Sequence, residues 1–215
     1  MLKNELIEKG NLMTTNLVIA EDQTLVLDAL TALIGFESDI KVVASCGDGT
    51  KALSFINSSD VIPDIVLTDI EMPHMTGIEL AETLQKQHPS IKIVIMTTFA
   101  KAGYMRRAIE AGVRGIVLKE APSNYLITSL RKVISGERVI DTELAMMALG
   151  DKDPLNSKER KALKLAAEGL STAEISEKLF IAQGTVRNYL SEAISKMNAT
   201  NRVDAARIAN QKGWL

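Results

Sequence analysis

Residues 65–69 read IVLTD, a short apolar run that ends in an aspartate. The run does not alternate between apolar and polar residues, which is typical of a strand buried on both faces. Similar runs lie at 17–20, 41–44, 91–96 and 116–118. Stretches of helical length separate them, at 23–35, 49–58, 77–88, 101–111 and 122–135. Strands that alternate with helices predict an α/β fold, a doubly wound parallel five-stranded sheet with helices on both sides.

A linker and a helical tail follow the last predicted strand. Residues 137–154 contain the turn dipeptides Gly150-Asp151 and Asp153-Pro154, although 142–149 is long enough for a short helix. From residue 156 onward only helical periodicity remains. It predicts four helices, at 157–168, 172–179, 184–197 and 202–212.

Local signals mark the starts and ends of the tail helices. Asn156 with Glu159, and Ser171 with Glu174, have the spacing of capping boxes. Gly169 lies where a helix C-cap belongs. We therefore divide the chain into an N-terminal extension at 1–15, an α/β domain at 16–136, a linker at 137–154 and an all-α domain at 155–215.

Composition excludes several classes of protein. The 215 residues are 46% apolar and 24% charged, which excludes a disordered or collagen-like chain. No apolar run approaches the roughly 18 residues of a membrane span, and the first residues lack the apolar core of a signal peptide. A single cysteine, Cys46, allows no internal disulfide and suits a reducing compartment, so we expect a cytoplasmic protein with no membrane partner.

Charge is distributed unevenly along the chain. From residue 156 to the end, 10 lysines and arginines outnumber 6 acidic residues, whereas the rest of the chain has 15 against 21. An acidic first part and a basic tail indicate two domains, of which the second faces a polyanion.

Acidic, hydroxyl and ammonium side chains follow the predicted strands at the points where these end. Glu21 and Asp22 follow the first strand, Asp69 ends the third, and Thr97 and Lys119 follow the fourth and fifth. Because ligands of a doubly wound sheet bind beyond the carboxyl ends of its strands, we expect these side chains to converge. Clustered carboxylates repel one another and need a cation, and all-oxygen ligation suits Mg²⁺. An aspartate beside Mg²⁺ can attack a phosphoryl group, whose oxygens a lysine and a threonine then hold.

The motifs at the strand ends make residues 16–136 resemble a response-regulator receiver domain. The sequences that carry the resemblance are IAEDQ at 19–23, DIEMP at 69–73 followed by Gly77, MTTF at 96–99 and LKE at 118–120. The resemblance implies that Asp69 is the phosphoacceptor, that Thr97 is the switch hydroxyl and that Lys119 binds the phosphoryl group. It implies as Mg²⁺ ligands Asp22, Asp69 and the backbone carbonyl of Glu71, with Glu21 acting through water.

Two positions depart from the receiver pattern. Ile116 stands three residues before Lys119, where the family usually has an aromatic residue that swings with the switch threonine. Tyr104 is either its substitute or an ordinary packing residue. Phe99 stands two residues past Thr97, where many relatives have a polar residue. Because an apolar ring cannot orient a hydrolytic water by hydrogen bonding, we expect a long-lived phosphoryl group and slow autodephosphorylation.

The predicted helix at 184–197 has two different faces. Val186, Leu190, Ile194 and Met197 recur at helical spacing and should face a core. Arg187, Asn188, Ser191 and Ser195 fall on the other side. An arginine can pair with guanine and an asparagine with adenine, so this face suits the major groove of DNA. Phosphate contacts are expected from Lys178, Lys196 and Arg202.

Residues 155–215 resemble a LuxR-type helix-turn-helix domain. The carriers are Glu159, Gly169, Glu174-Ile175, GTVRN at 184–188, Asn201-Arg202 and Gly213-Trp214. The resemblance implies that 172–179 is the positioning helix and 184–197 the recognition helix, with Thr185 joining the DNA contacts. Ala182 replaces the usual Ser or Thr cap of the recognition helix, which loosens the start of that helix by about 1 kcal/mol.

Together the two domains resemble the NarL/FixJ type of response regulator, and IAEDQ, TDIEMP and GTVRNY resemble the DesR branch. This implies that a sensor histidine kinase phosphorylates Asp69, and that phosphorylation promotes a homodimer through 23–35 and 122–135. The dimer would bind a double-stranded DNA operator and regulate transcription, and the protein would not be an enzyme. One alternative is a DNA-binding regulator that needs no phosphorylation. The other is a phosphatase with an aspartyl nucleophile. CGDGT at 46–50 resembles the Asp-x-Asp-Gly-Thr loop of such enzymes, but Cys46 stands where the nucleophilic aspartate should be.

Overall fold

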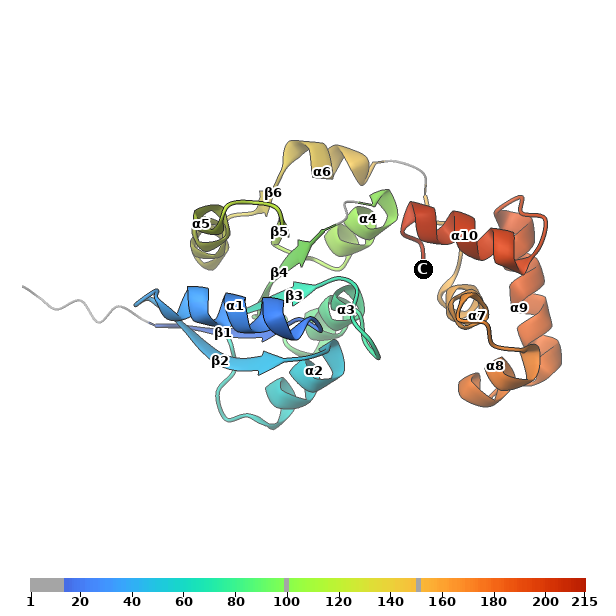
Figure 1. The fold of residues 1–215 in the computed structure, drawn as a ribbon, viewed down its shortest axis with the longest axis horizontal. Helices are drawn as coiled ribbons and strands as arrows, with labels where there is room; N and C mark the ends of the chain where they lie inside the picture. The colour runs from blue at the N-terminus through green and yellow to red at the C-terminus, as the bar shows by residue number, and fades with distance from the viewer. Residues whose placement is uncertain (1–13, 99–100, 150–151) are drawn as a thin grey trace, which may run out of the picture. The chain divides into compact units, whose positions relative to one another are not determined.

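A computed structural model describes residues 14–98, 101–149 and 152–215 (Figure 1). The chain forms two compact units. The first comprises the chain up to Thr98 together with Ala111–Ile140, and the second comprises Phe99–Glu110 together with Asp141–Leu215.

The first unit is built on a parallel sheet whose strand order is β2-β1-β3-β4-β5-β6. The strands are β1 (Thr15–Ala20), β2 (Ile40–Cys46), β3 (Ile65–Asp69), β4 (Lys92–Thr97), β5 (Gly115–Leu118) and β6 (Val139–Ile140). This confirms the doubly wound parallel sheet. The order reverses between β1 and β3, so the carboxyl ends of these two strands form the topological switch point.

The sheet has one strand more than the five expected from the sequence. β6 is only two residues long and pairs in parallel with β5, with Val139 beside Gly115. It lies in the stretch that the sequence led us to interpret as linker. A strand of two residues is too short to give a periodic signal in the sequence. The short helix expected at 142–149 is present as α6 (Thr142–Met147).

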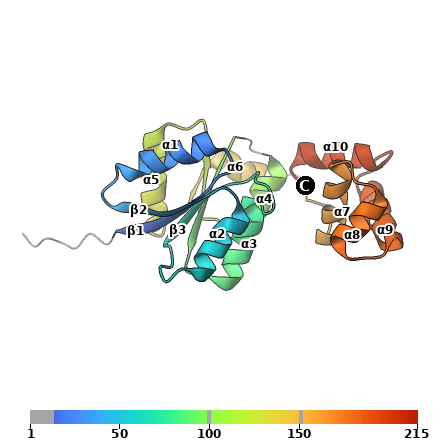
Figure 2. The same ribbon diagram turned by 60° about the horizontal axis from the view of Figure 1, so that its bottom comes forward.

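Helices cover both faces of the sheet. α1 (Thr24–Gly35) and α5 (Ser123–Ile134) lie on one face, and α2 (Gly49–Ser58) and α3 (Gly77–Gln87) lie on the other (Figure 2). Ile65, Val66 and Leu67 of β3 are fully buried, as expected for a strand with helices on both sides. Arg131 of α5 binds Glu37 and Asp39 at 2.5 and 2.7 Å and so ties α5 to the loop after α1.

The second unit is all helical. It contains α4 (Ala102–Glu110), α6, α7 (Ser157–Ala167), α8 (Thr172–Leu179), α9 (Gln183–Lys196) and α10 (Arg202–Lys212). The helices from α7 onward pack around Ala162, Leu163, Ile175, Val186 and Trp214.

The expected end signals of the tail helices are confirmed. Asn156 and Glu159 form a capping box at α7, and Ser171 and Glu174 form one at α8. Gly169 follows α7 with a φ of 91°, a left-handed conformation that costs glycine no steric penalty. Ala182 caps α9 without any side-chain hydrogen bond.

Candidate functional site

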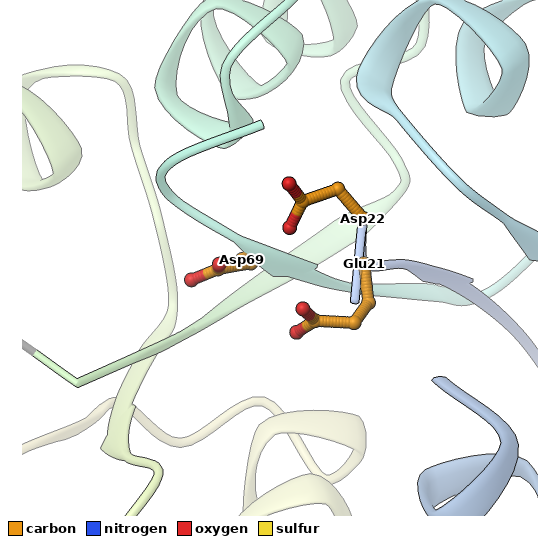
Figure 3. Close-up of side chains that lie close together, drawn as sticks. All are labelled: Glu21, Asp22 and Asp69. Atoms are coloured by element: carbon orange, nitrogen blue, oxygen red, sulfur yellow. The ribbon is translucent and has the colours of Figure 1, made fainter. Parts of the chain in front are cut away.

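Three carboxylates meet at the carboxyl ends of β1 and β3. Glu21 and Asp22 follow β1 directly, and Asp69 is the last residue of β3. Their carboxylate groups point to the same side and lie close together (Figure 3), with one oxygen of each within 4.8 Å of the others. Glu21 and Asp69 are buried and Asp22 is exposed. The cluster therefore combines strong mutual repulsion with an open side that solvent or a ligand can reach.

The Lys119 ammonium neutralises part of this charge. Its Nζ lies 2.7 Å from Glu21 Oε2 and 3.0 Å from Asp69 Oδ2. Burial lowers the pKa of Lys119, but its hydrogen bonds to Glu21 and Asp69 hold that pKa above the ordinary value. One cation thus faces three carboxylates, which leaves about two negative charges for a divalent cation to balance.

The Asp69 carboxyl group is held in one orientation. Its Oδ1 accepts a hydrogen bond of 2.7 Å from the Ile70 backbone N–H, and Lys119 holds its Oδ2. Burial raises the pKa of Asp69 to about 6, although the hydrogen bond from Lys119 lowers it, and the Glu21 charge adds to the rise. The position and the perturbed pKa are typical of a reactive carboxylate.

The structure also shows where most of the other residues singled out in the sequence for this site lie. Thr97 is buried at the end of β4, directly beside β3 in the sheet. Glu71 is exposed two residues past Asp69. Ile116 is buried within β5 and Tyr104 is buried in α4. Phe99 lies outside the described residues.

An apolar pocket beside the acidic site was missed by the sequence interpretation. It has a volume of about 420 Å³ and is lined by residues of α1 together with Met96, Thr98 and Lys119. Leu25 of α1 is 83% exposed and Phe36, just past α1, is 87% exposed. The available signal was the composition of α1, TLVLDALTALIG, which is too apolar for a helix with one solvated face.

The loop that resembles a phosphatase motif has a structural role. Cys46 is buried at the end of β2, where its backbone carbonyl accepts a hydrogen bond of 2.9 Å from the Glu21 N–H. The Asp48 side chain accepts a hydrogen bond of 2.9 Å from the Lys51 backbone N–H and so caps α2. These contacts give the motif a structural role at the ends of β2 and α2.

The division of the α9 surface is confirmed. Val186, Leu190 and Met197 are buried and Ile194 is half-buried, whereas Arg187, Asn188, Ser191 and Ser195 are exposed. Thr185 is half-buried in the first turn, and Lys178 is exposed near the end of α8. The exposed face presents one arginine, one asparagine and two hydroxyl groups, which can all bond base edges.

Lys196 has a partner that the sequence interpretation missed. Its Nζ binds both carboxylate oxygens of Glu159, at 2.7 and 2.8 Å. Glu159 is buried and also completes the capping box of α7. Although burial raises the pKa of Glu159, the hydrogen bonds from Lys196 and from the Asn156 backbone hold it below the ordinary value. In the free protein Lys196 therefore links α9 to α7.

Two protein-family models match the chain. The model of the response regulator receiver domain matches residues 17–131, and that of the bacterial regulatory proteins of the luxR family matches residues 153–209. No helix in the described part of the chain is long and apolar enough to span a membrane.

Similar proteins cover the chain almost end to end. The transcriptional regulatory proteins YvfU and DesR of Bacillus subtilis are 43% and 41% identical to it, each match covering 93% of this chain and 98% of the relative. YvfU is described as uncharacterized. Among solved structures, the RcsB response regulator of Salmonella typhimurium aligns with a TM-score of 0.71 at 23% identity, over 93% of this chain and 98% of that one.

Proposed function

The chain belongs to the response regulators that join a receiver domain to a LuxR-type DNA-binding domain, and we propose that phosphorylation of Asp69 switches its binding to DNA. The observation that carries this proposal is the set of three carboxylates at the switch point with Lys119 bound to two of them. The proposed domain bounds remain 16–136 and 155–215, with a linker between them.

Asp69 is the proposed nucleophile. One of its carboxylate oxygens attacks the phosphorus of a phosphohistidine on a sensor kinase, and the P–N bond breaks as the acyl phosphate forms. The hydrogen bond from Ile70 and the ion pair with Lys119 support this role, because they fix the carboxylate for attack. Lys119 then holds one phosphoryl oxygen by charge, and the buried Thr97 hydroxyl binds another.

Mg²⁺ is the proposed cofactor. The donor set fits it, because oxygen ligands with excess negative charge and one exposed member leave room for bound water. Asp22, Asp69 and the Glu71 carbonyl would hold the ion, with Glu21 acting through water. When bound, Mg²⁺ neutralises charge on the incoming phosphoryl group.

The exposed face of α9 is the proposed reader of DNA. Arg187 and Asn188 would contact base edges, with Ser191 and Thr185 beside them. Lys178 is placed to meet phosphates because it is exposed and forms no ion pair within the described residues. A phosphate contact by Lys196 would require its ammonium to leave Glu159 or to bind both.

Phosphorylation is proposed to make a homodimer through α1 and α5. The exposed Leu25 and Phe36 support this surface, because they add apolar area that a partner chain could bury. Two DNA-binding domains on one operator gain affinity through effective concentration. We place this switch in the cytoplasm, where the DNA lies.

The test is phosphorylation of the purified chain by acetyl phosphate and Mg²⁺, followed by intact mass. One phosphate should add to the wild type, none to Asp69→Asn, and little to Asp22→Ala. Asp60→Asn, which changes an exposed aspartate elsewhere, should label like the wild type. Full labelling of Asp69→Asn would exclude Asp69 as phosphoacceptor. Tight operator binding without labelling would favour a regulator that needs no phosphorylation.

A further inference from the structure

A second pocket lies at the opposite edge of the sheet, where the strands begin. It has a volume of about 230 Å³, and its lining includes Gln85, Lys92, Arg114 and Arg138. Lys92 is the first residue of β4, Arg114 precedes β5, and Arg138 precedes β6. We call it the strand-start pocket. It shares no residue with the acidic site or with the surface of α9.

The sheet register places the two arginines side by side. Gly115 pairs with Val139 in the parallel ladder, so Arg114 and Arg138 occupy equivalent positions on neighbouring strands. The Val139 N–H donates to the Arg114 carbonyl at 2.9 Å, which fixes this register at the pocket itself. Like charges at neighbouring positions of a sheet repel each other. An anion bound between the two guanidinium groups would relieve this repulsion.

No carboxylate of the described residues pairs with these arginines. None of the residues that line the pocket is acidic. Within the described residues, neither Arg114 nor Arg138 forms an ion pair or a side-chain hydrogen bond. The neighbouring Glu137 instead accepts a hydrogen bond of 3.2 Å from the Ser135 hydroxyl.

Helix capping explains Lys92 but not the arginines. Lys92 Nζ donates to the Ile134 carbonyl at 2.8 Å, at the negative end of α5. The two guanidinium groups have no such acceptor in the described part of the chain, so they can bind a ligand in the pocket. Gln85 adds an amide to the pocket wall, and Gly112, which has a left-handed conformation and no side chain, leaves room for this amide.

We propose that the strand-start pocket binds a small phosphate-bearing anion between Arg114 and Arg138. The planar guanidinium fork pairs with two oxygens of a phosphate group at once, which suits Arg better than Lys for such a site. The volume is below the 300–1,000 Å³ or so of pockets that hold drug-sized ligands, so the pocket suits inorganic phosphate or a compact phosphomonoester. This ligand is separate from the phosphoryl group on Asp69.

The test uses the full-length protein labelled with ¹⁵N, in EDTA so that the acidic site holds no Mg²⁺. Inorganic phosphate is titrated against chloride at constant ionic strength, and the backbone amides of Gly112 and Gly136 are followed by NMR. Both glycines line the pocket and should shift together and saturate. Arg114→Gln and Arg138→Gln should each weaken phosphate binding at least tenfold, and the double variant should abolish it.

The controls separate this site from other basic surfaces. Lys161→Gln removes an exposed cation from α7 and should leave the glycine shifts unchanged, and labelling of Asp69 should be the same in all variants. Both arginines are exposed, so their replacement leaves the core intact, which circular dichroism would verify. Shifts that do not saturate, that chloride reproduces, or that persist in the double variant would overturn the proposal.

Discussion

Replacing Asp69 by Asn should stabilise the first compact unit, which contains the sheet and which we call the receiver unit, when no metal is bound. The Asp69 carboxylate is buried beside Glu21, and burial raises its pKa from the ordinary 3.8 to about 6. At about 1.4 kcal/mol per pKa unit, ionising this group in the folded state costs at most roughly 3 kcal/mol at pH 7. Asn keeps an oxygen for Lys119 and removes the charge. We therefore expect a gain of about 1–3 kcal/mol in the free energy of unfolding.

The sign of the pH dependence follows from the same pKa. Between pH 4 and 6 the folded state holds a proton on Asp69 that the unfolded chain releases. The wild-type receiver unit should therefore gain about 1.3 kcal/mol from this group as the pH falls from 7 to 5. The Asp69→Asn variant should lack this gain.

Urea unfolding with two probes measures the effect. The chain has a single tryptophan, and Trp214 lies in the core of the helical unit, so its fluorescence follows that unit. Circular dichroism follows both units. Asp69→Asn should raise the midpoint of the transition seen only by circular dichroism, and Asp60→Asn should leave it unchanged. Mg²⁺ should stabilise the wild type more than the variant. A variant equal to or less stable than the wild type in EDTA at pH 7 would refute this reasoning.

Lys196→Met should lower the stability of the helical unit by about 1–3 kcal/mol, because it leaves Glu159 buried without its cation, and Trp214 fluorescence in urea would report the loss. Arg187→Ala should weaken operator binding by about 1–3 kcal/mol and relax the preference for one base of the operator. Fluorescence anisotropy with operator variants would measure both effects, and an equal loss of affinity for every variant would contradict base recognition by Arg187. Leu25→Glu should keep the phosphorylated protein monomeric in sedimentation velocity. In the absence of kinase, phosphorylated Phe99→Glu should lose its phosphoryl group faster than the phosphorylated wild type. Equal rates of hydrolysis would count against the idea that Phe99 excludes the hydrolytic water.

Much of the site could be predicted from the sequence because its residues directly follow strands. Asp69 and Glu21 each end or follow an apolar run, and parallel strands bring their carboxyl ends to one edge. The helices at 172–179 and 202–212 were predicted to the residue, because Ser171 and Asn201 cap them.

Contacts between distant side chains could not be predicted in this way. The pair of Lys196 and Glu159 joins residues 37 positions apart, and no periodicity relates them. Arg160 likewise binds Asp153, the Leu155 carbonyl and the Trp214 carbonyl, which ties the end of the linker to the last residues of the chain. Such contacts depend on the packing of whole helices, which sequence spacing alone does not define.

The two-residue strand β6 covers part of a sheet edge that would otherwise favour aggregation. β5 reads GIVL, and without a neighbour its backbone N–H and C=O groups would form an exposed apolar edge on which another chain could add a strand. β6 pairs with Gly115 and Ile116 and covers half of that edge. A receiver unit cut at residue 136 would lose this cover and should form aggregates that one cut after Ile140 does not. The residues of β6, which connect the receiver unit to the linker, thus also hinder β5 from pairing with a strand of another chain.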